Sequence, residues 1–369
     1  MARVRISRGV PCVLAAIIAI AAPRAVHAGL LVAGEDASYV GQVFYYNSAT
    51  GASLGNFTSG GPALDGPSAA RFGPDGNLYV LSGGDTVYRY NGQTGVYIGT
   101  FVATNSNNLE EAKDMLFGPD GNLYIAANCS NLCPVGVVGE GGRVMRFNGA
   151  TGAYMGDFVA NGAGAASGTG RLSEAMGMAF DRNGNLYVGN DAASLSGTSP
   201  TDNVLKFSSS GTFVAVFVPD NDHGLQDPNS LVFGADGNLY IAWEDVANSL
   251  PSSHYAGVVS CYNGSTGAFI DFFVPSGSHG LTEAQGLAFG PDGNLYVGSG
   301  DTGEVFRFNG QTGAFIDVFV AAGAGGLADP KCLAFTLEKA IPVLGGWGMV
   351  LLITAVGLSA AYVLARRAG

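Results

Sequence analysis

The chain has 369 residues, of which 47% are hydrophobic, and its formal net charge is −12 at pH 7. This negative charge argues against binding to nucleic acid or anionic lipid, whose phosphates attract basic surfaces. The 58 glycines stand between regular runs of Phe, Leu, Tyr and Val. The composition therefore also argues against a disordered, low-complexity chain.

Residues 1–28 have the features of a secretory signal peptide. Arg3, Arg5 and Arg8 precede an apolar run at 12–22. The cleavage site that a signal peptidase recognises follows, with small or short residues in Val26-His27-Ala28. The apolar run is shorter than the roughly 20 residues that a transmembrane helix needs. We therefore expect export with cleavage after Ala28.

A hairpin sequence recurs along the rest of the chain. The stretch at 289–297, Phe-Gly-Pro-Asp-Gly-Asn-Leu-Tyr-Val, has close copies at 72–80, 117–125, 180–188 and 233–241. Pro and Gly at its centre predict a tight turn between two apolar strands. A third strand, a second Gly-closed turn and a fourth strand follow, as at 304–320. Each unit is therefore predicted to have four antiparallel strands.

The spacing of the units indicates a β-propeller. The Asn of the hairpin turn falls at 77, 122, 185, 238 and 294, close to the roughly 40–50 residues of one propeller blade, with the excess in loops. An open β-sandwich is the alternative, but it does not account for the regular hairpins.

The two ends of the repeat region predict how the ring closes. Segment 30–57 matches strands two to four of a unit, whereas 326–335 matches only strand one. The last strand should therefore complete the first blade. The fold predicted for 29–340 is an all-β, six-bladed β-propeller. Closure of the ring removes exposed sheet edges, and we expect the ectodomain to be monomeric.

The strand order assigns the connections to two faces. The one-to-two and three-to-four turns share one face, here called the turn face, and the other connections share the loop face. The long insertions at 126–142, 161–173, 189–202 and 243–256 belong to the loop face. Variable loops on a rigid scaffold commonly bind ligands. Segment 29–340 has 29 acidic and 11 basic residues, so its formal net charge is −18. This charge favours divalent cations or neutral glycans as partners.

Polar residues gather where the second strands end on the loop face. They are Glu35, Asp36, Asp85, Asn128, Asn190, Asp191, Glu244, Asp245 and Asp301. Ca²⁺ takes six to eight oxygen ligands, so converging carboxylates make it the candidate cofactor. The candidate metal ligands are Asp191, Asn229, Glu244, Asp245 and Asp301. The alternative is that these acids only solvate the rim.

Two histidines occupy equivalent positions in adjacent units. His223 and His279 each precede Gly-Leu shortly before a first strand, where we expect side chains to approach the central channel. With Glu244 they are candidate acid/base groups or metal ligands. The alternative is a surface histidine copied with its repeat.

Two functions of different classes remain open. The first is a binding module that takes a glycan, peptide or matrix component through the loop face. The second is a metal-assisted hydrolase or lyase. The chain has no G-x-S-x-G nucleophile elbow and no H-E-x-x-H motif, and its repeat regularity favours the binding module.

The four cysteines beyond the signal peptide divide into two groups. Cys129 and Cys133 share one loop, and export favours a disulfide between them over a metal clip, which needs further ligands. Cys261 and Cys332 lie in apolar strands, where we expect small buried side chains.

The C-terminal segment has the composition of a membrane anchor. Residues 347–365 carry no charge and are long enough to cross a bilayer, and Arg366 and Arg367 follow at once. The positive-inside rule makes 366–369 a cytoplasmic tail and places the propeller outside. An interfacial helix is the alternative, but the segment lacks a polar face.

This segment resembles the bacterial IPTL-CTERM sorting signal. The resemblance rests on Ile341, Pro342, Leu344, Trp347 and Gly348, followed by the apolar stretch and the arginine pair, whereas Val343 replaces the usual Thr. Residues 341–346 are then a sorting motif and linker. The resemblance implies a Gram-negative envelope protein in the inner membrane, with a periplasmic ectodomain, that an exosortase-like enzyme recognises and sorts to the cell surface.

The Gly-Asn-Leu-Tyr-Val hairpins resemble those of NHL-type six-bladed propellers over nearly the whole of 29–340. Such propellers include lactone hydrolases, lyases and binding scaffolds. The resemblance therefore supports the fold and does not choose between the two functions.

Overall fold

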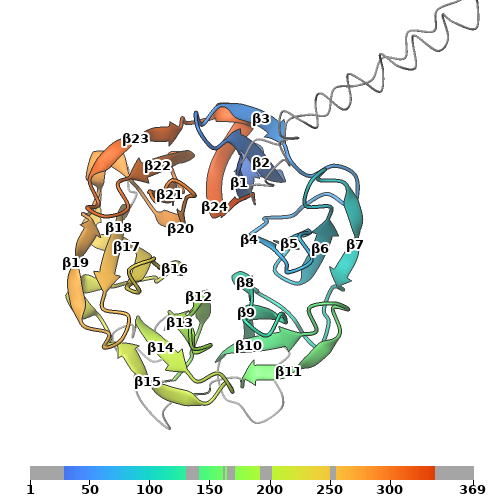
Figure 1. The fold of residues 1–369 in the computed structure, drawn as a ribbon, viewed down its shortest axis with the longest axis horizontal. Coiled ribbons are helices and arrows are strands. Elements are labelled where there is room, and N and C mark those ends of the chain that lie inside the picture. Colours follow the sequence, from blue (N-terminus) through green and yellow to red (C-terminus); the bar gives the residue numbers. More distant parts are fainter. Residues whose placement is uncertain are drawn as a thin grey trace, which may run out of the picture.

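The computed structural model describes residues 29–129, 141–160, 163, 171–191, 202–249 and 255–336. The described chain forms six four-stranded antiparallel sheets, arranged as the blades of a ring around a central channel (Figure 1). The predicted all-β, six-bladed propeller is confirmed. Among these residues no helix is long and apolar enough to cross a membrane. The predicted signal peptide, sorting motif, transmembrane segment and tail lie outside the described residues.

The strands of each blade are given from the channel outward. Blade 1 has β24 (Leu327–Phe335), β1 (Gly29–Asp36), β2 (Gly41–Asn47) and β3 (Ser53–Asn56). Blade 2 has β4 (Ala69–Phe72), β5 (Leu78–Ser82), β6 (Thr86–Tyr90) and β7 (Tyr97–Val102). Blade 3 has β8 (Asp114–Phe117), β9 (Leu123–Cys129), β10 (Gly141–Phe147) and β11 (Tyr154–Val159).

Blade 4 has β12 (Ala175–Phe180), β13 (Leu186–Asn190), β14 (Asn203–Phe207) and β15 (Phe213–Val218). Blade 5 has β16 (Ser230–Phe233), β17 (Leu239–Ser249), β18 (Tyr255–Tyr262) and β19 (Phe269–Val274). Blade 6 has β20 (Ala284–Phe289), β21 (Leu295–Ser299), β22 (Glu304–Phe308) and β23 (Phe315–Val320). In the described chain, three short 3-10 helices lie between blades: η1 (Asp222–Gly224), η2 (Ser278–Gly280) and η3 (Ala324–Gly326).

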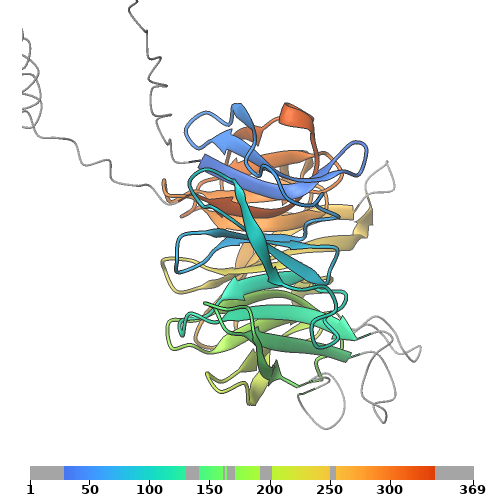
Figure 2. The ribbon, with the colours of Figure 1, turned by 90° about the vertical axis from the view of Figure 1, so that its right-hand side faces the viewer.

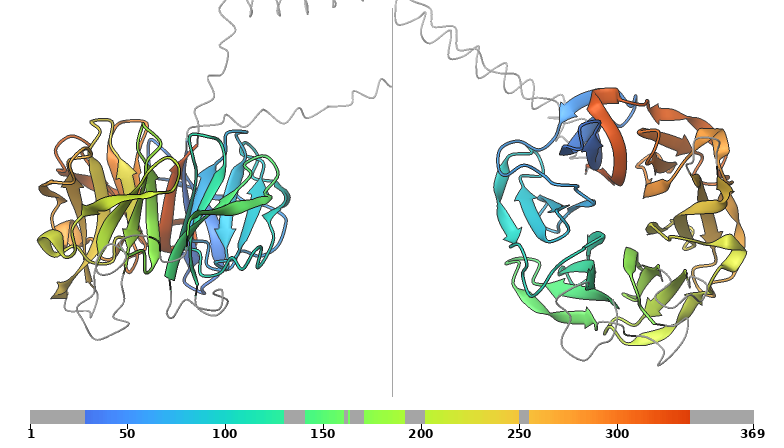
Figure 3. Two further views of the ribbon diagram at one scale, coloured as in Figure 1. Left: turned by 90° about the horizontal axis from the view of Figure 1, so that it is seen from below. Right: turned by 180° about the vertical axis from the view of Figure 1, so that it is seen from behind.

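The first blade combines both ends of the described chain, as the sequence predicts. β24 pairs antiparallel with β1, from Leu30 opposite Phe335 to Asp36 opposite Leu327. Next to this pairing, the backbone N–H of Gly29 donates to Thr336 Oγ1 at 2.7 Å. The two ends of the described chain therefore meet at one side of the ring, as the side views show (Figures 2 and 3).

The repeated hairpin turn is held by its aspartate. In blade 2, Asp75 Oδ1 accepts from the backbone N–H of Asn77 at 3.0 Å, and Asp75 Oδ2 accepts from Tyr79 Oη at 3.0 Å. Gly76 has φ +76°, a left-handed conformation that glycine adopts without strain. The turn therefore needs both Asp and Gly, which explains why the motif repeats.

The core lies between neighbouring blades. Tyr79 of β5 makes edge-to-face contacts with Phe101 of its own blade, at 4.7 Å between ring centroids, and with Phe117 of blade 3, at 4.9 Å. The same three-ring packing recurs around the tyrosines at 124, 187, 240 and 296. At Tyr296 the second partner is Phe335 of β24, so this packing also joins blade 6 to blade 1.

Candidate functional site

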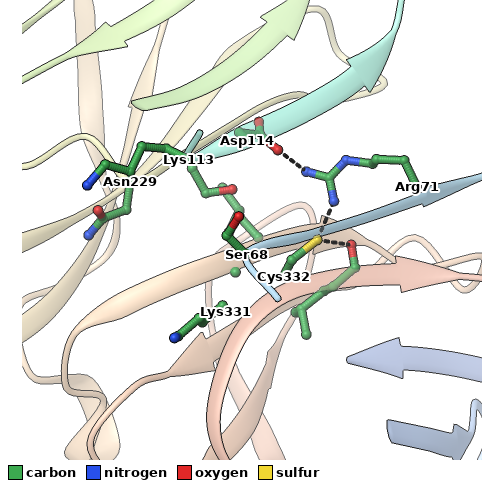
Figure 4. A pocket seen from close by; sticks show the side chains of 11 residues that line it. Ser68, Arg71, Lys113, Asp114, Asn229, Lys331 and Cys332 are labelled. Carbon is green, nitrogen blue, oxygen red and sulfur yellow. Dashed lines mark hydrogen bonds and ion pairs between the residues drawn. The ribbon is translucent and has the colours of Figure 1, made fainter. Parts of the chain in front are cut away.

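A cavity lies in the central channel, between the innermost strands. Its lining comes from five of the six innermost strands or the residues just before them, namely β4, β8, β16, β20 and β24. The polar side chains in this lining are Ser68, Arg71, Lys113, Asp114, Asn229, Ser230 and Lys331 (Figure 4). The cavity is therefore suited to a polar ligand rather than an apolar one.

One wall of the cavity is a buried polar group. Arg71 Nη2 lies 3.1 Å from Asp114 Oδ1, and the Arg71 guanidinium also donates to Cys332 Sγ. Burial opposes the charge of Arg71, but Cys332 and Asp114 together raise its pKa. Burial also raises the pKa of Asp114, and Arg71 partly offsets this effect. Cys332 is buried as predicted, but it has a polar partner and is not only a small hydrophobe.

Above the cavity, one repeat position supplies acidic side chains around the channel. It lies two residues before the repeat position at which Ser68, Lys113, Asn229 and Lys331 line the cavity. It is acidic in five of the six units, where the residues are Gly66, Glu111, Glu174, Asp227, Glu283 and Asp329. Acids at the ends of the second strands and at the start of β14 add to this ring. We call six of these side chains, all from blades 4 to 6, the acidic arc: Asp191, Asp202, Asp227, Glu244, Glu283 and Asp301.

Three carboxylates of the arc come together. Asp191 follows β13, Asp202 precedes β14 and Asp227 precedes β16, and one oxygen from each lies within 4.8 Å of the others. Asp202 is only 4% exposed. Burial, followed by the charges of Asp227, Asp202 and Glu174, raises the pKa of Asp191 to about 8. This geometry resembles a cation site, since each residue offers one oxygen ligand.

Glu244 connects this group to the cavity. Asn229, which lines the cavity, donates from Nδ2 to Glu244 Oε1 at 3.2 Å. Burial and then the charges of Glu283 and Asp227 raise the pKa of Glu244 to about 7, while the Asn229 hydrogen bond lowers it. Asp227 acts on both Asp191 and Glu244, so the arc is electrostatically continuous.

Lysines pair with acids that lie just outside the two ends of the arc. Lys331 Nζ lies 2.9 Å from Glu35 and 3.4 Å from Asp329, and Lys113 Nζ lies 3.1 Å from Glu174. Within the part of the chain that the structure describes, no ion pair joins Asp191, Asp227 or Glu244 to a Lys, Arg or His side chain. Among the described residues, these three carboxyl groups therefore have no ion pair that offsets their mutual repulsion.

Several predicted site residues have other roles. Asp36 accepts backbone hydrogen bonds from Ser38 and Val40 in a turn, and Asp85 accepts from the Thr86 hydroxyl. Asn128 accepts from the backbone N–H of Ala175 and donates to Glu174. Asn190 is fully buried and holds the backbone that leads to β12.

The remaining metal candidates divide. Asp301 belongs to the arc, since its charge contributes to the raised pKa of Glu244 and of Asp329. Asp245, in contrast, accepts from the Ser276 hydroxyl at 2.8 Å, and it is not part of the three-carboxylate group. The pairing predicted between Cys129 and Cys133 falls outside what the structure describes.

The expected position of the histidines on the channel is wrong. His223 stacks on Phe269 and His279 stacks on Phe315, and both phenylalanines begin the outermost strands, β19 and β23. Glu244 accepts a hydrogen bond from Asn229, and the charges that shift its pKa are those of other acids, not of a histidine. Each sheet twists, so its outermost strand runs along the rim of the ring (Figure 1). The connection that follows this strand, which contains the histidine, therefore also begins at the rim.

Sequence reasoning missed Glu174, Asp202, Asp227 and Glu283. Three of them occupy the repeat position before strand one, so aligning the six units on that position would have revealed them. Asp202 has no such signal, because it follows an insertion and approaches Asp191 only through the pairing of β13 with β14.

Comparison with known proteins does not assign the chain to a family. No protein-family model matches the chain, and no curated protein matches it. Among solved structures, the chain is similar to one described as a streptogramin B lyase structure, with 13% identity and a TM-score of 0.45, over 69% of this chain and 68% of that one. Fold and site together define a six-bladed β-propeller with a polar channel cavity and an acidic arc at its mouth.

Proposed function

We propose that this propeller is a binding module that takes a positively charged ligand, in the simplest case Ca²⁺, at the mouth of its channel. The observation that carries the proposal is the crowding of carboxyl groups in the acidic arc, where burial, and then the charges of the neighbouring acids, raise the pKa of Asp191 to about 8 and that of Glu244 to about 7. A bound cation relieves this repulsion and so stabilises the native state.

The cavity provides the second support for a binding function. Asn229 lies in the cavity lining and also bonds to Glu244, so a ligand on the arc has polar groups below it in the channel. A larger ligand with a cationic group, such as a glycan, peptide or matrix component carrying one, has hydrogen-bonding partners there.

The proposal is tested by the thermal stability of the full chain with and without Ca²⁺. Saturating Ca²⁺ should raise the Tm of the wild type, and the double variant Asp191→Asn/Glu244→Gln should lose that shift. Asp85→Asn is the matched control, because Asp85 is a loop-face acid in blade 2, bonded to Thr86 and outside the arc. An equal Ca²⁺ shift in the double variant would refute the site.

A metal-assisted hydrolase or lyase is the second candidate. It is favoured by one observation, that Glu244 has a pKa of about 7, because a general acid or base works best near the operating pH. His223 and His279 lie on the rim and do not take part in this version. Turnover of a lactone or ester that needs added metal and falls at least about tenfold in Glu244→Gln would support it.

We also propose that the protein is exported and anchored in the envelope. The support is the sequence alone: the signal-peptide features of 1–28, the uncharged stretch 347–365 and the arginine pair at 366 and 367. On this proposal an exosortase-like enzyme recognises Ile341, Pro342 and Leu344. The binding face then lies outside the cytoplasm.

A further inference from the structure

Two histidines lie flat on phenylalanines at the outer rim of blades 5 and 6. The rings of His223 and Phe269 are 3.7 Å apart between centroids with an interplanar angle of 12°, and those of His279 and Phe315 are 3.9 Å apart at 10°. We call these two pairs the histidine tiles. Each tile joins a 3-10 turn, η1 or η2, to the outermost strand of the following blade.

The backbone does not require histidine at these positions. His223 has φ +54° and His279 has φ +55°, left-handed conformations that are strained for most residues. The corresponding residues of two other units are Asn107, at φ +52°, and Gly325, at φ +68°. Strained backbone at a residue that glycine would suit better is typical of functional positions.

Both tiles present an exposed, oriented imidazole. The His223 side chain is 46% exposed, and its Nδ1 lies 3.1 Å from Asp222 Oδ2. His279 Nδ1 lies 3.1 Å from Ser278 Oγ. Among the described residues, neither Nε2 atom has a hydrogen-bond partner. In the neutral tautomer whose proton is on Nδ1, the Nε2 atom of His223 is a hydrogen-bond acceptor.

The strands below the tiles add exposed apolar side chains. In β19, Ile270 is 48% exposed and Phe272 is 43% exposed, and the Phe272 ring centroid lies 6.4 Å from that of His223. In β23, Ile316 and Val318 are the equivalents, at 41% and 39%. Each tile is therefore a flat ring with a polar edge, set in an apolar surface.

We propose that the histidine tiles form a bivalent binding surface for a neutral polysaccharide. A sugar ring has an apolar face that can pack on a flat aromatic ring, and its hydroxyl groups can bond to the polar edge beside that ring. The tiles are copies on adjacent blades, which suits a ligand that repeats along its own length and gains avidity from two contacts. The net charge of −12 disfavours an anionic polymer.

Glycine substitution tests the tiles without disturbing the backbone. His223→Gly and His279→Gly remove the imidazole and relieve the left-handed strain, and Gly325 shows that the turn accommodates glycine. The single and double variants of the full chain should therefore keep the Tm of the wild type to within a few degrees. A loss of about 1 kcal/mol in the free energy of unfolding would lower Tm by roughly 2–4 °C. Unchanged Tm then separates a binding role from a packing role.

Binding is measured by affinity electrophoresis in gels that contain soluble β-1,3-glucan, β-1,4-xylan or dextran, with hyaluronan as the anionic control. At least one neutral polymer should retard the wild type. Each single variant should bind it at least about tenfold more weakly, because bivalent attachment is lost, and the double variant should not bind it. Asp191→Asn/Glu244→Gln should bind as the wild type does, which separates this surface from the acidic arc.

Three results of the binding measurement would overturn the proposal. They are no retardation by any neutral polymer, full retention of binding in the double glycine variant, and retardation by hyaluronan in place of the neutral polymers. A large fall in Tm with binding unchanged would identify the tiles as packing elements, which also contradicts the proposal.

Discussion

Asn229 Nδ2 lies 3.2 Å from Glu244 Oε1, and this bond links the channel cavity to the acidic arc. The bond lowers the pKa of Glu244 against the effects of burial and of Glu283. In Asn229→Ala we therefore expect the apparent pKa of Glu244 to rise above about 7. Carbon-detected NMR titration of the Glu244 carboxyl measures it, with Asn128→Ala as the control at a different amide. A lower pKa in Asn229→Ala would show that the amide does not stabilise the carboxylate.

The pH dependence of stability should change in Asp191→Asn. The pKa of Asp191 is raised from 3.8 to about 8 in the folded protein, so the native state retains a proton that the unfolded state releases within this window. The contribution of Asp191 to stability therefore falls as pH rises from about 4 to about 8. The Tm of Asp191→Asn should exceed that of the wild type at pH 8 and should match it more closely at pH 4. Parallel Tm profiles would contradict the shift.

Gly51 lies where blade 1 meets blade 6, and we expect any larger residue there to destabilise the fold. Gly51 has φ +68°, and a Cβ there would lie 1.7 Å from the carbonyl oxygen of Phe319 in β23. Gly55 has φ +91°, and its Cβ would have open space. Gly55→Ala should therefore lose only about 1 kcal/mol from backbone strain, whereas Gly51→Ala should lose about 2–4 kcal/mol. Denaturant unfolding compares the two, and equal losses would argue against tight contact at this junction.

Arginine at position 261 should stabilise blade 5. Cys261 stands where Arg89, Arg146, Lys206 and Arg307 stand in other blades, each near an aromatic ring of its outermost strand. Burial raises the pKa of Cys261 to about 11, so the thiol stays neutral and adds no charge.

Cys261→Arg should stack on Phe273 and approach Asp271, as Arg307 does with Phe319 and Asp317. We expect a gain of about 0.5–1 kcal/mol in the free energy of unfolding. Cys261→Ser is the control and should lose stability. A destabilised arginine variant would mean that this position cannot hold a long side chain.

Removal of residues 341–369 should release the protein from the membrane while the propeller stays folded, because the described fold ends with β24 and Thr336. Fractionation of cells and the circular dichroism of the released protein measure both effects. Retention of the truncated protein in the membrane fraction would contradict the proposed anchor.

The repeats predicted the strands well because each blade is specified locally. All six first strands end at the predicted phenylalanine, at 72, 117, 180, 233, 289 and 335. The Pro-Asp-Gly turn and the Tyr that bonds its Asp lie within a few residues of each other, so the sequence contains the whole interaction.

The candidate site was predicted only in part because it is built between blades. Asp191 and Glu244 were recognised from the ends of their strands, but their partner Asp227 lies on another connection and depends on how neighbouring blades pack. The position of His223 could not be read from its distance to strand one, because sheet twist moves that connection outward to Phe269.

The most direct test of the acidic arc is the number of protons released when Ca²⁺ binds. It is obtained at pH 7 by titration calorimetry of the full chain in buffers of different ionisation enthalpy. Since Asp191 has a pKa of about 8 and Glu244 of about 7, a cation on the arc must displace protons from both. We predict a net release of roughly one to one and a half protons per Ca²⁺, smaller at pH 9 and strongly reduced in Asp191→Asn/Glu244→Gln. Calcium binding without proton release, or no binding at all, would contradict the account.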